Sequence, residues 1–371
     1  MLSAFVHAPS ICSSNTLSHC VSPKLNLSRS SMAVSSIRIA VVGDVHDCWN
    51  LEQDSKALEL LQLVYTYEKS VSMLKIECHG IDLFMICINS QRPEQISMSV
   101  CAKFMPCDFG EENLEVIKSV VNLEFAKAVI LGNHDAWFTK QFSGSLGKEH
   151  VAYQRSDFPQ IKVSVVGGRP FSIGGKPMFR KKLLLARYGV KDMDESAKRI
   201  QKAALGTPED HFLILLAHNG PTGLGSDSND ICGKDWEFEG DGDHGDPDLA
   251  QAISLLKENN QISIPLVVFG HMHKELAYGN GFRKMIVVGA DNTIYLNGAI
   301  VPRVKRLGGD EDKKSLDDES ALASPEAKGT RRAFTLVEIS EGRVAKIAES
   351  WVSVVEDRTT LEEEHILFES S

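Results

Sequence analysis

The sequence predicts an α/β fold built around central β-sheets, and three features of its pattern lead to this prediction. Short apolar runs recur along the chain and are typical of strands that are buried on both faces. Segments with apolar residues at helical spacing lie between many of these runs. Later in the chain, strand-like runs follow one another with little helix between them. This order indicates an α/β domain with a β-rich second half.

The predicted buried strands are the elements with the clearest pattern in the sequence. Residues 37–43 read IRIAVVG, a continuous apolar run with the length of one strand. Because such a run has no polar face, we expect it to be covered on both sides. Four later runs have the same character: Lys127–Leu131, Ile161–Val166, Phe212–Ala217 and Pro265–Phe269.

Helices are predicted between these strands, and further strands are predicted after them. Four segments place their apolar residues at helical spacing, namely Leu51–Leu63, Glu111–Val120, Glu195–Ala204 and Asp248–Glu258. The later segments that resemble consecutive strands are Met285–Val288, Thr293–Val301, Ala333–Ile339 and Arg343–Val354.

Two segments differ in composition from the rest of the chain. Residues 308–332 are polar and highly charged, so they cannot bury enough apolar surface to fold alone, and we interpret them as a disordered acidic loop. Residues 1–36 hold eleven Ser and two basic residues but no acidic residue, which is typical of an organelle transit peptide. Because Ser outweighs Arg, we expect a chloroplast protein, with a plain disordered tail as the alternative. The predicted domain then spans residues 37–371.

Composition narrows the classes of function. Among the 371 residues, 50 are acidic and 40 basic, a net charge of -10 that disfavours nucleic acid as a partner. No apolar run approaches the length of a membrane span, so we expect no membrane partner either. The eight cysteines include no CxxC pair and form no regular disulfide pattern, which favours a reduced compartment. The oligomeric state cannot be predicted from these features.

Four short polar motifs each follow a predicted strand. They are GDVH at residues 43–46, GNHD at 132–135, His218 after an apolar run, and GHMH at 270–273. Functional groups in α/β proteins cluster at the carboxyl ends of strands, so these motifs are expected to meet in one crevice. Asp and Asn oxygens mixed with imidazole nitrogens suit Mn, Fe or Zn. Taken singly, each motif could be a helix cap, a turn or a strand-end histidine; together they predict a metal site.

The series GDVH, GNHD, AHNG and GHMH resembles the calcineurin-like metallophosphoesterase superfamily. The longer strings LGNHDAW, LLAHNGPTGLG and GDPDLAQAI resemble a subgroup found in cyanobacteria and plants, and the resemblance covers about residues 37–300. It implies a four-layer α/β/β/α sandwich with two mixed β-sheets. It also implies a metal-dependent hydrolase that cleaves phosphate esters at a two-metal centre holding two divalent ions (Mn, Fe or Zn).

The resemblance assigns roles to particular residues. Two divalent ions would polarise a bridging water toward hydroxide and neutralise the charge of the phosphoryl group. His134 would stabilise the transition state or protonate the leaving oxygen, and Asp135 would orient His134. The metal ligands would be Asp44, His46 and His273 for the first ion, and Asn133, His218 and His271 for the second.

The motif that should supply the aspartate bridging both ions is disrupted. The best candidate is Asp108, which follows Cys107 where the family has a glycine. Residues 96–106 before it make a poor strand, whereas Ile81–Ile88 makes a better one and ends at Asn89, the second candidate. Residues 64–106 have no clear periodicity, and we interpret them as an anomalous insertion: translated intron or, alternatively, a genuine lineage-specific segment. Sequencing the transcript across codons 60–110 distinguishes the two, because an uninterrupted message would exclude the intron.

The expected substrate is a small phosphorylated molecule. Proteins of this superfamily that act on phosphoproteins carry arginines beside their GD and GNH motifs, and neither Asp108 nor Asp135 has such a neighbour. The alternative is a non-catalytic or degenerate metal-binding member, which the disrupted motif favours. The acidic, Gly-rich segment 223–245 follows the His218 motif and is either a lid over the substrate or a solvated loop. His244 within it is not among the expected metal ligands.

Overall fold

The fold is described from a computed structural model. The residues described are 37–44, 49–68, 83–88, 117–118, 120–123, 125–137, 144–236, 242–258, 262–307 and 329–370. Residues 1–36 lie outside them, so the transit peptide stays a prediction. None of the helices in the described part of the chain is long and apolar enough to cross a membrane.

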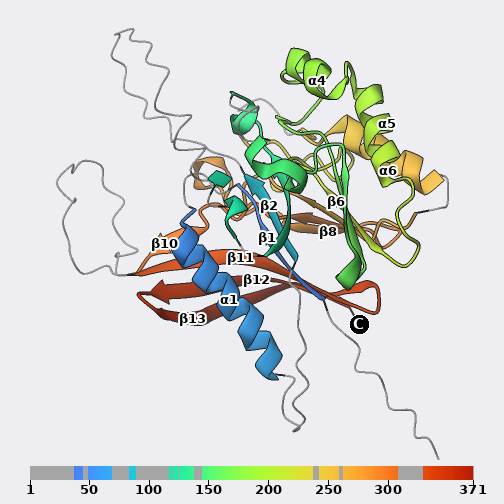
Figure 1. The fold of residues 1–371 in the computed structure, drawn as a ribbon. Coiled ribbons are helices and arrows are strands. Elements are labelled where there is room, and N and C mark those ends of the chain that lie inside the picture. Colours follow the sequence, from blue (N-terminus) through green and yellow to red (C-terminus); the bar gives the residue numbers. More distant parts are fainter. Residues whose placement is uncertain are drawn as a thin grey trace, which may run out of the picture. The chain divides into compact units, whose positions relative to one another are not determined.

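Two mixed β-sheets form the centre of the fold (Figure 1). The first sheet has the strand order β13-β12-β11-β1-β2-β3, with β10 also paired to β11. The second has the order β4-β5-β6-β7-β9-β8. The strands of the first sheet are β1 (Ile37–Val42), β2 (Leu83–Ile88), β3 (Ala126–Leu131), β10 (Val304–Arg306), β11 (Gly329–Ser340), β12 (Arg343–Val355) and β13 (Arg358–Glu369). Those of the second are β4 (Arg155–Phe158), β5 (Val163–Gly167), β6 (Phe212–Leu216), β7 (Leu266–Phe269), β8 (Ile286–Val288) and β9 (Ile294–Asn297).

The strands alternate their side chains between two apolar layers. In β1, Ile39 and Val41 face the second sheet, and their neighbour Val42 packs on the opposite side. In β6, Ile214 lies between the sheets and Leu215 packs outward. This alternation is what a strand covered on both faces requires, and it explains why these runs are apolar throughout.

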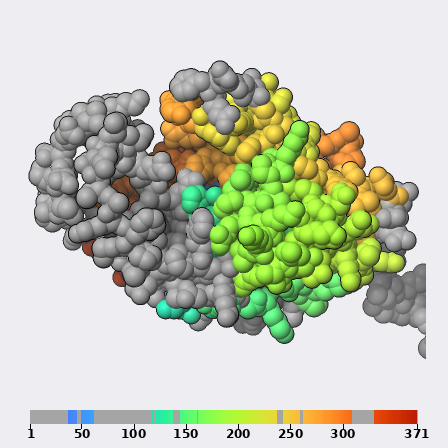
Figure 2. Space-filling view, turned by 90° about the horizontal axis from the view of Figure 1, so that it is seen from above, coloured from blue at the N-terminus to red at the C-terminus, as the bar shows by residue number. Residues whose placement is uncertain are grey.

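Helices cover the outer faces of both sheets. Helix α1 (Leu51–Glu68) packs Leu58 and Leu61 against the first sheet and crosses β11 to β13 in Figure 1. The second sheet is covered by α5 and α6, which lie side by side, and α4 lies near them in Figure 1. The green and yellow atoms of this part of the chain gather on one face in Figure 2. The predicted four-layer α/β/β/α sandwich is therefore confirmed. The bounds of these helices are Lys181–Tyr188 for α4, Met193–Ala204 for α5 and Pro247–Glu258 for α6.

Most predicted elements are present, and their ends differ for local reasons. The strand expected at Ile161–Val166 begins only at Val163, because Lys162 has the left-handed backbone φ of 51°. The strand expected at Thr293–Val301 ends at Asn297. There the chain passes close to β1, since a Cβ at Gly298 would meet Val41 Cγ1 at 2.6 Å. Most of the predicted helix at 111–120 lies outside the described residues.

Two predicted irregular segments contribute to the first sheet. Strand β11 begins at Gly329, so the end of the predicted loop 308–332 is wrong by four residues. The charge that suggested a loop belongs partly to Arg332, whose Nη1 pairs with Oδ2 of buried Asp54 at 2.7 Å. Strand β2 falls inside the stretch 64–106 and lies between β1 and β3, parallel to both. The anomalous stretch therefore supplies a central strand.

The first prediction concerns the dependence of stability on pH. His150 is 5% exposed, and burial lowers its pKa from 6.5 to about 4. A histidine whose pKa is lower in the folded state contributes its full stability above pH 6.5 and loses it as the pH falls towards 4. From pH 7 to pH 5, we expect this histidine to reduce the free energy of unfolding by about 2 kcal/mol.

Urea unfolding at pH 7 and pH 5 checks this expectation. His150→Gln removes the titrating group, so its stability should fall by about 2 kcal/mol less than that of the wild type over this interval. The other histidines titrate in both proteins and cancel in the comparison. Equal losses in the two proteins would contradict the assignment to His150.

Candidate metal centre

Asp44 joins the end of β1 to the end of β7. It follows β1, is fully buried, and has the left-handed backbone φ of 46°. Its Oδ2 accepts a hydrogen bond from the backbone N–H of His271 at 2.5 Å. Gly270 is required at this approach, because a Cβ there would lie 2.9 Å from the same carboxylate oxygen. The first and last predicted motifs therefore meet at one edge, the carboxyl ends of their strands.

Asn133 and His218 meet at the same edge. Asn133 follows β3, and His218, which is fully buried, follows β6. The Oδ1 atom of Asn133 lies 2.8 Å from Nε2 of His218. The ring of His218 contacts that of His271 edge-to-face, with centroids 5.0 Å apart. These side chains come from both sheets, so the site lies where the carboxyl ends of the two sheets meet.

A backbone carbonyl sets the orientation of His271. Its Nε2 donates a hydrogen bond to the carbonyl oxygen of Ile173 at 3.2 Å. With the proton on Nε2, the other nitrogen, Nδ1, carries the lone pair that a metal ligand needs. This Nδ1 is buried and has no hydrogen-bond partner among the residues that the structure describes. Metal-ligating histidines are typically held in this way, by a backbone carbonyl on the nitrogen that does not bind the ion.

The donor set fits a divalent cation. Nitrogen and oxygen ligands bind such ions at about 2.0–2.2 Å, so two neighbouring ligand atoms lie about 3 Å apart. The separation of 2.8 Å between Asn133 Oδ1 and His218 Nε2 matches this spacing. Within the described ranges, no three His, Cys, Asp or Glu side chains are grouped closely enough to hold an ion. Two expected ligands, His46 and Asp108, lie outside the described residues.

The remaining candidates surround this set. His134 opens a short 3-10 helix directly after Asn133, and burial lowers its pKa. Burial also lowers the pKa of His273 to about 4 and that of His271 to about 3, and the charge of His134 contributes to both shifts. The imidazoles of His271 and His273 are therefore neutral at neutral pH, which is the form that binds metal.

Asp135 has a structural contact that the sequence did not reveal. Its Oδ2 accepts a hydrogen bond from the backbone N–H of Gly132 at 2.8 Å, which fixes the turn that carries Asn133. Burial raises the pKa of Asp135 well above its ordinary value, and the nearby charge of Asp44 raises it further. Its expected role of orienting His134 stays a prediction.

A buried ionic cluster holds the segment whose backbone carbonyl orients His271. Arg169 is 2% exposed, and its guanidinium pairs with Asp246 at 2.7 Å and with Asp248 at 2.9 Å. Ser172 Oγ donates a further hydrogen bond to Asp246 at 2.5 Å. The cluster fixes the segment 169–175, which presents the Ile173 carbonyl, against the start of α6. Both aspartates belong to the GDPDLAQAI string, but no pattern in the sequence indicated their arginine partner.

The second prediction concerns this cluster. Arg169→Met leaves two buried carboxylates without their cation, and we expect a loss of about 3–5 kcal/mol in the free energy of unfolding. Arg155→Met is the control, because its ion pair with Asp157 is partly exposed and should cost less than about 1 kcal/mol. Urea unfolding at pH 7 measures both variants. If Arg169→Met lost no more than about 1 kcal/mol, as expected for Arg155→Met, the cluster would contribute little to the free energy of unfolding.

A second arginine ties the segment after His218 to the GHMH motif. Arg283 Nε donates to the carbonyl oxygen of His273 at 3.0 Å. Its Nη1 donates to the carbonyl oxygens of Asp230 at 2.7 Å and Gly233 at 2.6 Å. The buried side chain of Arg283 therefore links the described part of the segment 223–245 to the GHMH motif.

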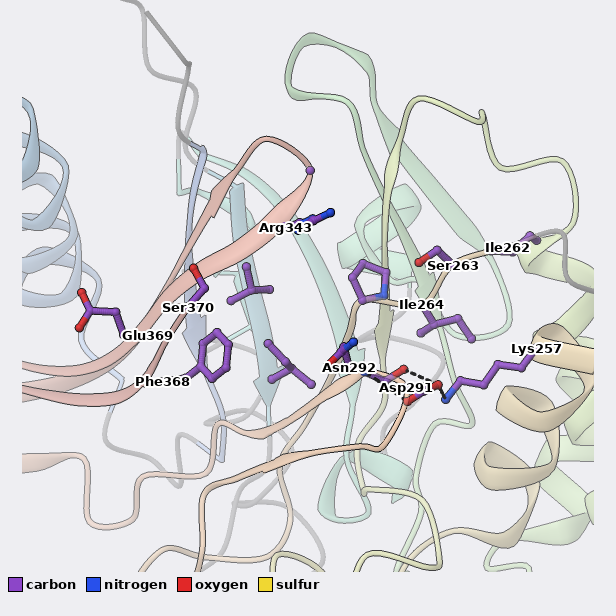
Figure 3. A pocket seen from close by; sticks show the side chains of 15 residues that line it. Lys257, Ile262, Ser263, Ile264, Asp291, Asn292, Arg343, Phe368, Glu369 and Ser370 are labelled. Carbon is purple, nitrogen blue, oxygen red and sulfur yellow. Dashed lines mark hydrogen bonds and ion pairs between the residues drawn. The ribbon is translucent and has the colours of Figure 1, made fainter.

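A large cavity lies away from this site. It measures about 1120 Å³, and its lining comes from the starts of β7, β9 and β12 and the end of β13 (Figure 3). Lys257 and Asp291 form an ion pair at its wall, with 2.5 Å between Nζ and Oδ2. The site residues instead follow the ends of β1, β3, β6 and β7. The cavity therefore lies at the opposite edge of the second sheet.

A family model described as "Calcineurin-like phosphoesterase" matches residues 37–275. The chain belongs to the calcineurin-like phosphoesterase family. The match covers the segments that carry Asp44, Asn133, His218 and His271, which the structure brings together. Family membership confirms the predicted superfamily and supports metal-dependent hydrolysis of phosphate esters in general. The resemblance to a cyanobacterial and plant subgroup is not confirmed.

Two solved structures are similar to the chain. The protein TT1561 of Thermus thermophilus is 13% identical, with a TM-score of 0.37, covering 71% of this chain and 90% of that chain. GAP50, described as the anchor in the inner membrane complex of Plasmodium, is 12% identical with a TM-score of 0.40, covering 91% of this chain and 90% of that chain. Similarity this distant says nothing about substrate. No curated protein sequence matches the chain.

Proposed function

We propose that this member of the calcineurin-like phosphoesterase family is a metal-dependent hydrolase that cleaves small phosphate esters at a two-metal centre. The observation that supports this proposal best is the meeting of Asp44, Asn133, His218 and His271 at one edge of the two sheets. Their oxygen and neutral nitrogen donors suit Mn, Fe or Zn. The buried Nδ1 of His271, which no group in the described ranges engages, supports an ion at this place.

Some of these residues would bind the metal ions, and His134 would take part in the reaction itself. When bound, two divalent ions would supply Lewis-acid activation of a water and neutralise the charge of the phosphoryl group. Asp44, Asn133, His218, His271 and His273 would hold them, with His46 and Asp108 completing the set. His134, next to Asn133, would place its imidazole against the leaving oxygen, where it stabilises the developing charge or donates a proton.

The test uses the full chain, stripped of metal and then supplied with Mn²⁺. Hydrolysis of an aryl phosphate monoester and of an aryl phosphodiester is followed with and without the metal. We expect turnover that depends on Mn²⁺ and falls by about 100-fold or more in His134→Ala. The ester that is cleaved faster indicates the substrate class. Turnover that is unchanged in His134→Ala would point to a contaminating phosphatase.

The second candidate is a non-catalytic member of the family that binds metal. The observation that favours it is the disrupted motif around Asp108, where the bridging aspartate is expected. Such a protein would bind Mn²⁺ at the Asn133 and His218 side of the site but hydrolyse neither ester. Metal binding in equilibrium dialysis without turnover would therefore replace the proposal with this one.

We also propose that the protein acts in chloroplasts on a small phosphorylated molecule, with neither nucleic acid nor membrane as a partner. The Ser-rich, acid-free composition of residues 1–36 supports the location. The excess of acidic residues supports the exclusion of nucleic acid. Residues 1–36 fused to a fluorescent protein should direct it to plastids, and a diffuse signal would overturn the proposed location.

A further inference from the structure

An aromatic path runs outward from the metal centre. The ring of His244 stacks against that of His271, with centroids 6.1 Å apart and 20° between the planes. The ring of Trp236 meets that of His244 edge-to-face at 4.7 Å. Both outer residues belong to the segment 223–245, so this segment supplies the wall beside the predicted ligand His271. The sequence did not predict this contact.

His244 is held rigidly in this wall. Its Nε2 donates to the carbonyl oxygen of Ile173 at 2.6 Å, the same oxygen that accepts from His271. Its own carbonyl oxygen accepts from Asn219 Nδ2 at 2.8 Å and from the backbone N–H of Gly175 at 2.9 Å. Gly174 is required at this approach, because a Cβ there would overlap His244. Because these contacts fix the position of His244, its ring can hold the neighbouring Trp236 ring in place.

Trp236 follows a well-anchored residue and is partly exposed to solvent. Asp235, the preceding residue, accepts a hydrogen bond from the backbone N–H of Ala277 at 2.8 Å and pairs with Arg283 at 3.1 Å. The Trp236 side chain nevertheless stays 38% exposed. Lys234 Nζ lies over one face of the indole, 5.9 Å from its centroid, so a planar group would stack on the other face. Trp236 therefore leaves part of its apolar surface open near His244 and His271.

We propose that Trp236 stacks on a planar aromatic group carried by the substrate, so that the enzyme prefers nucleotide-like phosphate esters to sugar phosphates. The inference rests on the proposed function, because it places the phosphate at the metal centre. The phosphate would bind beside His271, and the aromatic group would lie along the path through His244 to the indole. Stacking on an aromatic side chain contributes substantially to the binding of any base and does not depend on its identity.

The test compares adenosine 5′-monophosphate with ribose 5-phosphate, which differ only in the base. Their dissociation constants are measured by calorimetry on the full chain carrying His134→Ala and loaded with Mn²⁺, so that turnover is not needed. We expect the nucleotide to bind about tenfold tighter or more. Trp236→Ala should weaken nucleotide binding until the two affinities match, and Trp236→Phe should retain most of the preference. Ile366→Ala, an exposed apolar residue on β13, should change neither affinity.

The outcomes separate this inference from the proposed function. Equal affinities in the parent protein, no binding of either compound, or a preference that survives Trp236→Ala would each overturn the stacking role. A Trp236-dependent preference confirms the role whether or not the wild type hydrolyses an ester. Turnover of aryl esters, together with equal binding of the two compounds, would support the proposed function and overturn the stacking role.

Discussion

Replacing His271 by alanine is expected to lower Mn²⁺-dependent hydrolysis of an aryl phosphate by about 1,000-fold or more. His271 sits at the centre of the candidate site: its backbone N–H binds Asp44, and its ring contacts that of His218. Removing the imidazole would remove one of the proposed metal donors and the ring that contacts both His218 and His244. A loss of this size corresponds to about 4 kcal/mol of transition-state stabilisation, within the range that one metal ion supplies.

Metal content distinguishes a lost ligand from a damaged fold. The wild type is expected to retain more Mn²⁺ after dialysis than His271→Ala, while both unfold at similar urea concentrations. His365→Ala is the matched control, because His365 lies on β13 with its side chain 59% exposed and pairs there with Glu363. Unchanged turnover in His271→Ala would mean that the ion, if one binds, lies elsewhere.

Most of the strands that the sequence predicted correctly are covered on both faces, although β3 and β8 each lie at the end of a sheet. Runs such as the one that became β6 are apolar throughout because inner and outer layers both exclude water from them. Strand β13 was not predicted, because its residues alternate between exposed and half-buried at the edge of its sheet. Strand β4 is likewise a short, polar edge strand. Edge strands have only one partner, so their sequences carry a weaker signal.

The site was predictable where the chemistry is carried by side chains at the ends of strands. Asp44, Asn133, His218 and His271 each follow a strand, and the parallel arrangement brings these ends together. The groups that orient them were not predictable. A backbone carbonyl such as that of Ile173 has no signature in the sequence, and Arg169 meets its partners more than 70 positions further along the chain.

The position of β2 bears on whether Asn89 or Asp108 is the bridging ligand. Ile88, its last residue, is paired with Leu131, the last residue of β3, so the two strands end at the same level. Asn133 follows β3 by two residues, and Asn89 follows β2 directly in the sequence. Asp108 comes twenty residues after the end of β2, and a chain of that length can readily return to the same edge. Both candidates are therefore compatible with the topology.

Asp108→Asn is expected to lower Mn²⁺-dependent turnover by about 100-fold or more, whereas Asn89→Ala should change it by no more than about threefold. A bridge between two cations needs a carboxylate, because its negative charge offsets their mutual repulsion and its two oxygens can each face one ion. Asn89 offers an amide, whose single oxygen carries only a partial charge. The change of Asp108 to Asn keeps the shape of the side chain and removes that charge.

The double variant Asn89→Asp with Asp108→Asn decides between the two positions. If a carboxylate bridges the ions only from position 108, moving it to position 89 should not restore turnover. Restored turnover would show that a carboxylate directly after β2 can also bridge the ions. Turnover is measured as a function of Mn²⁺ concentration in the three variants and in the wild type. Each titration gives both the rate of hydrolysis and the apparent affinity for Mn²⁺.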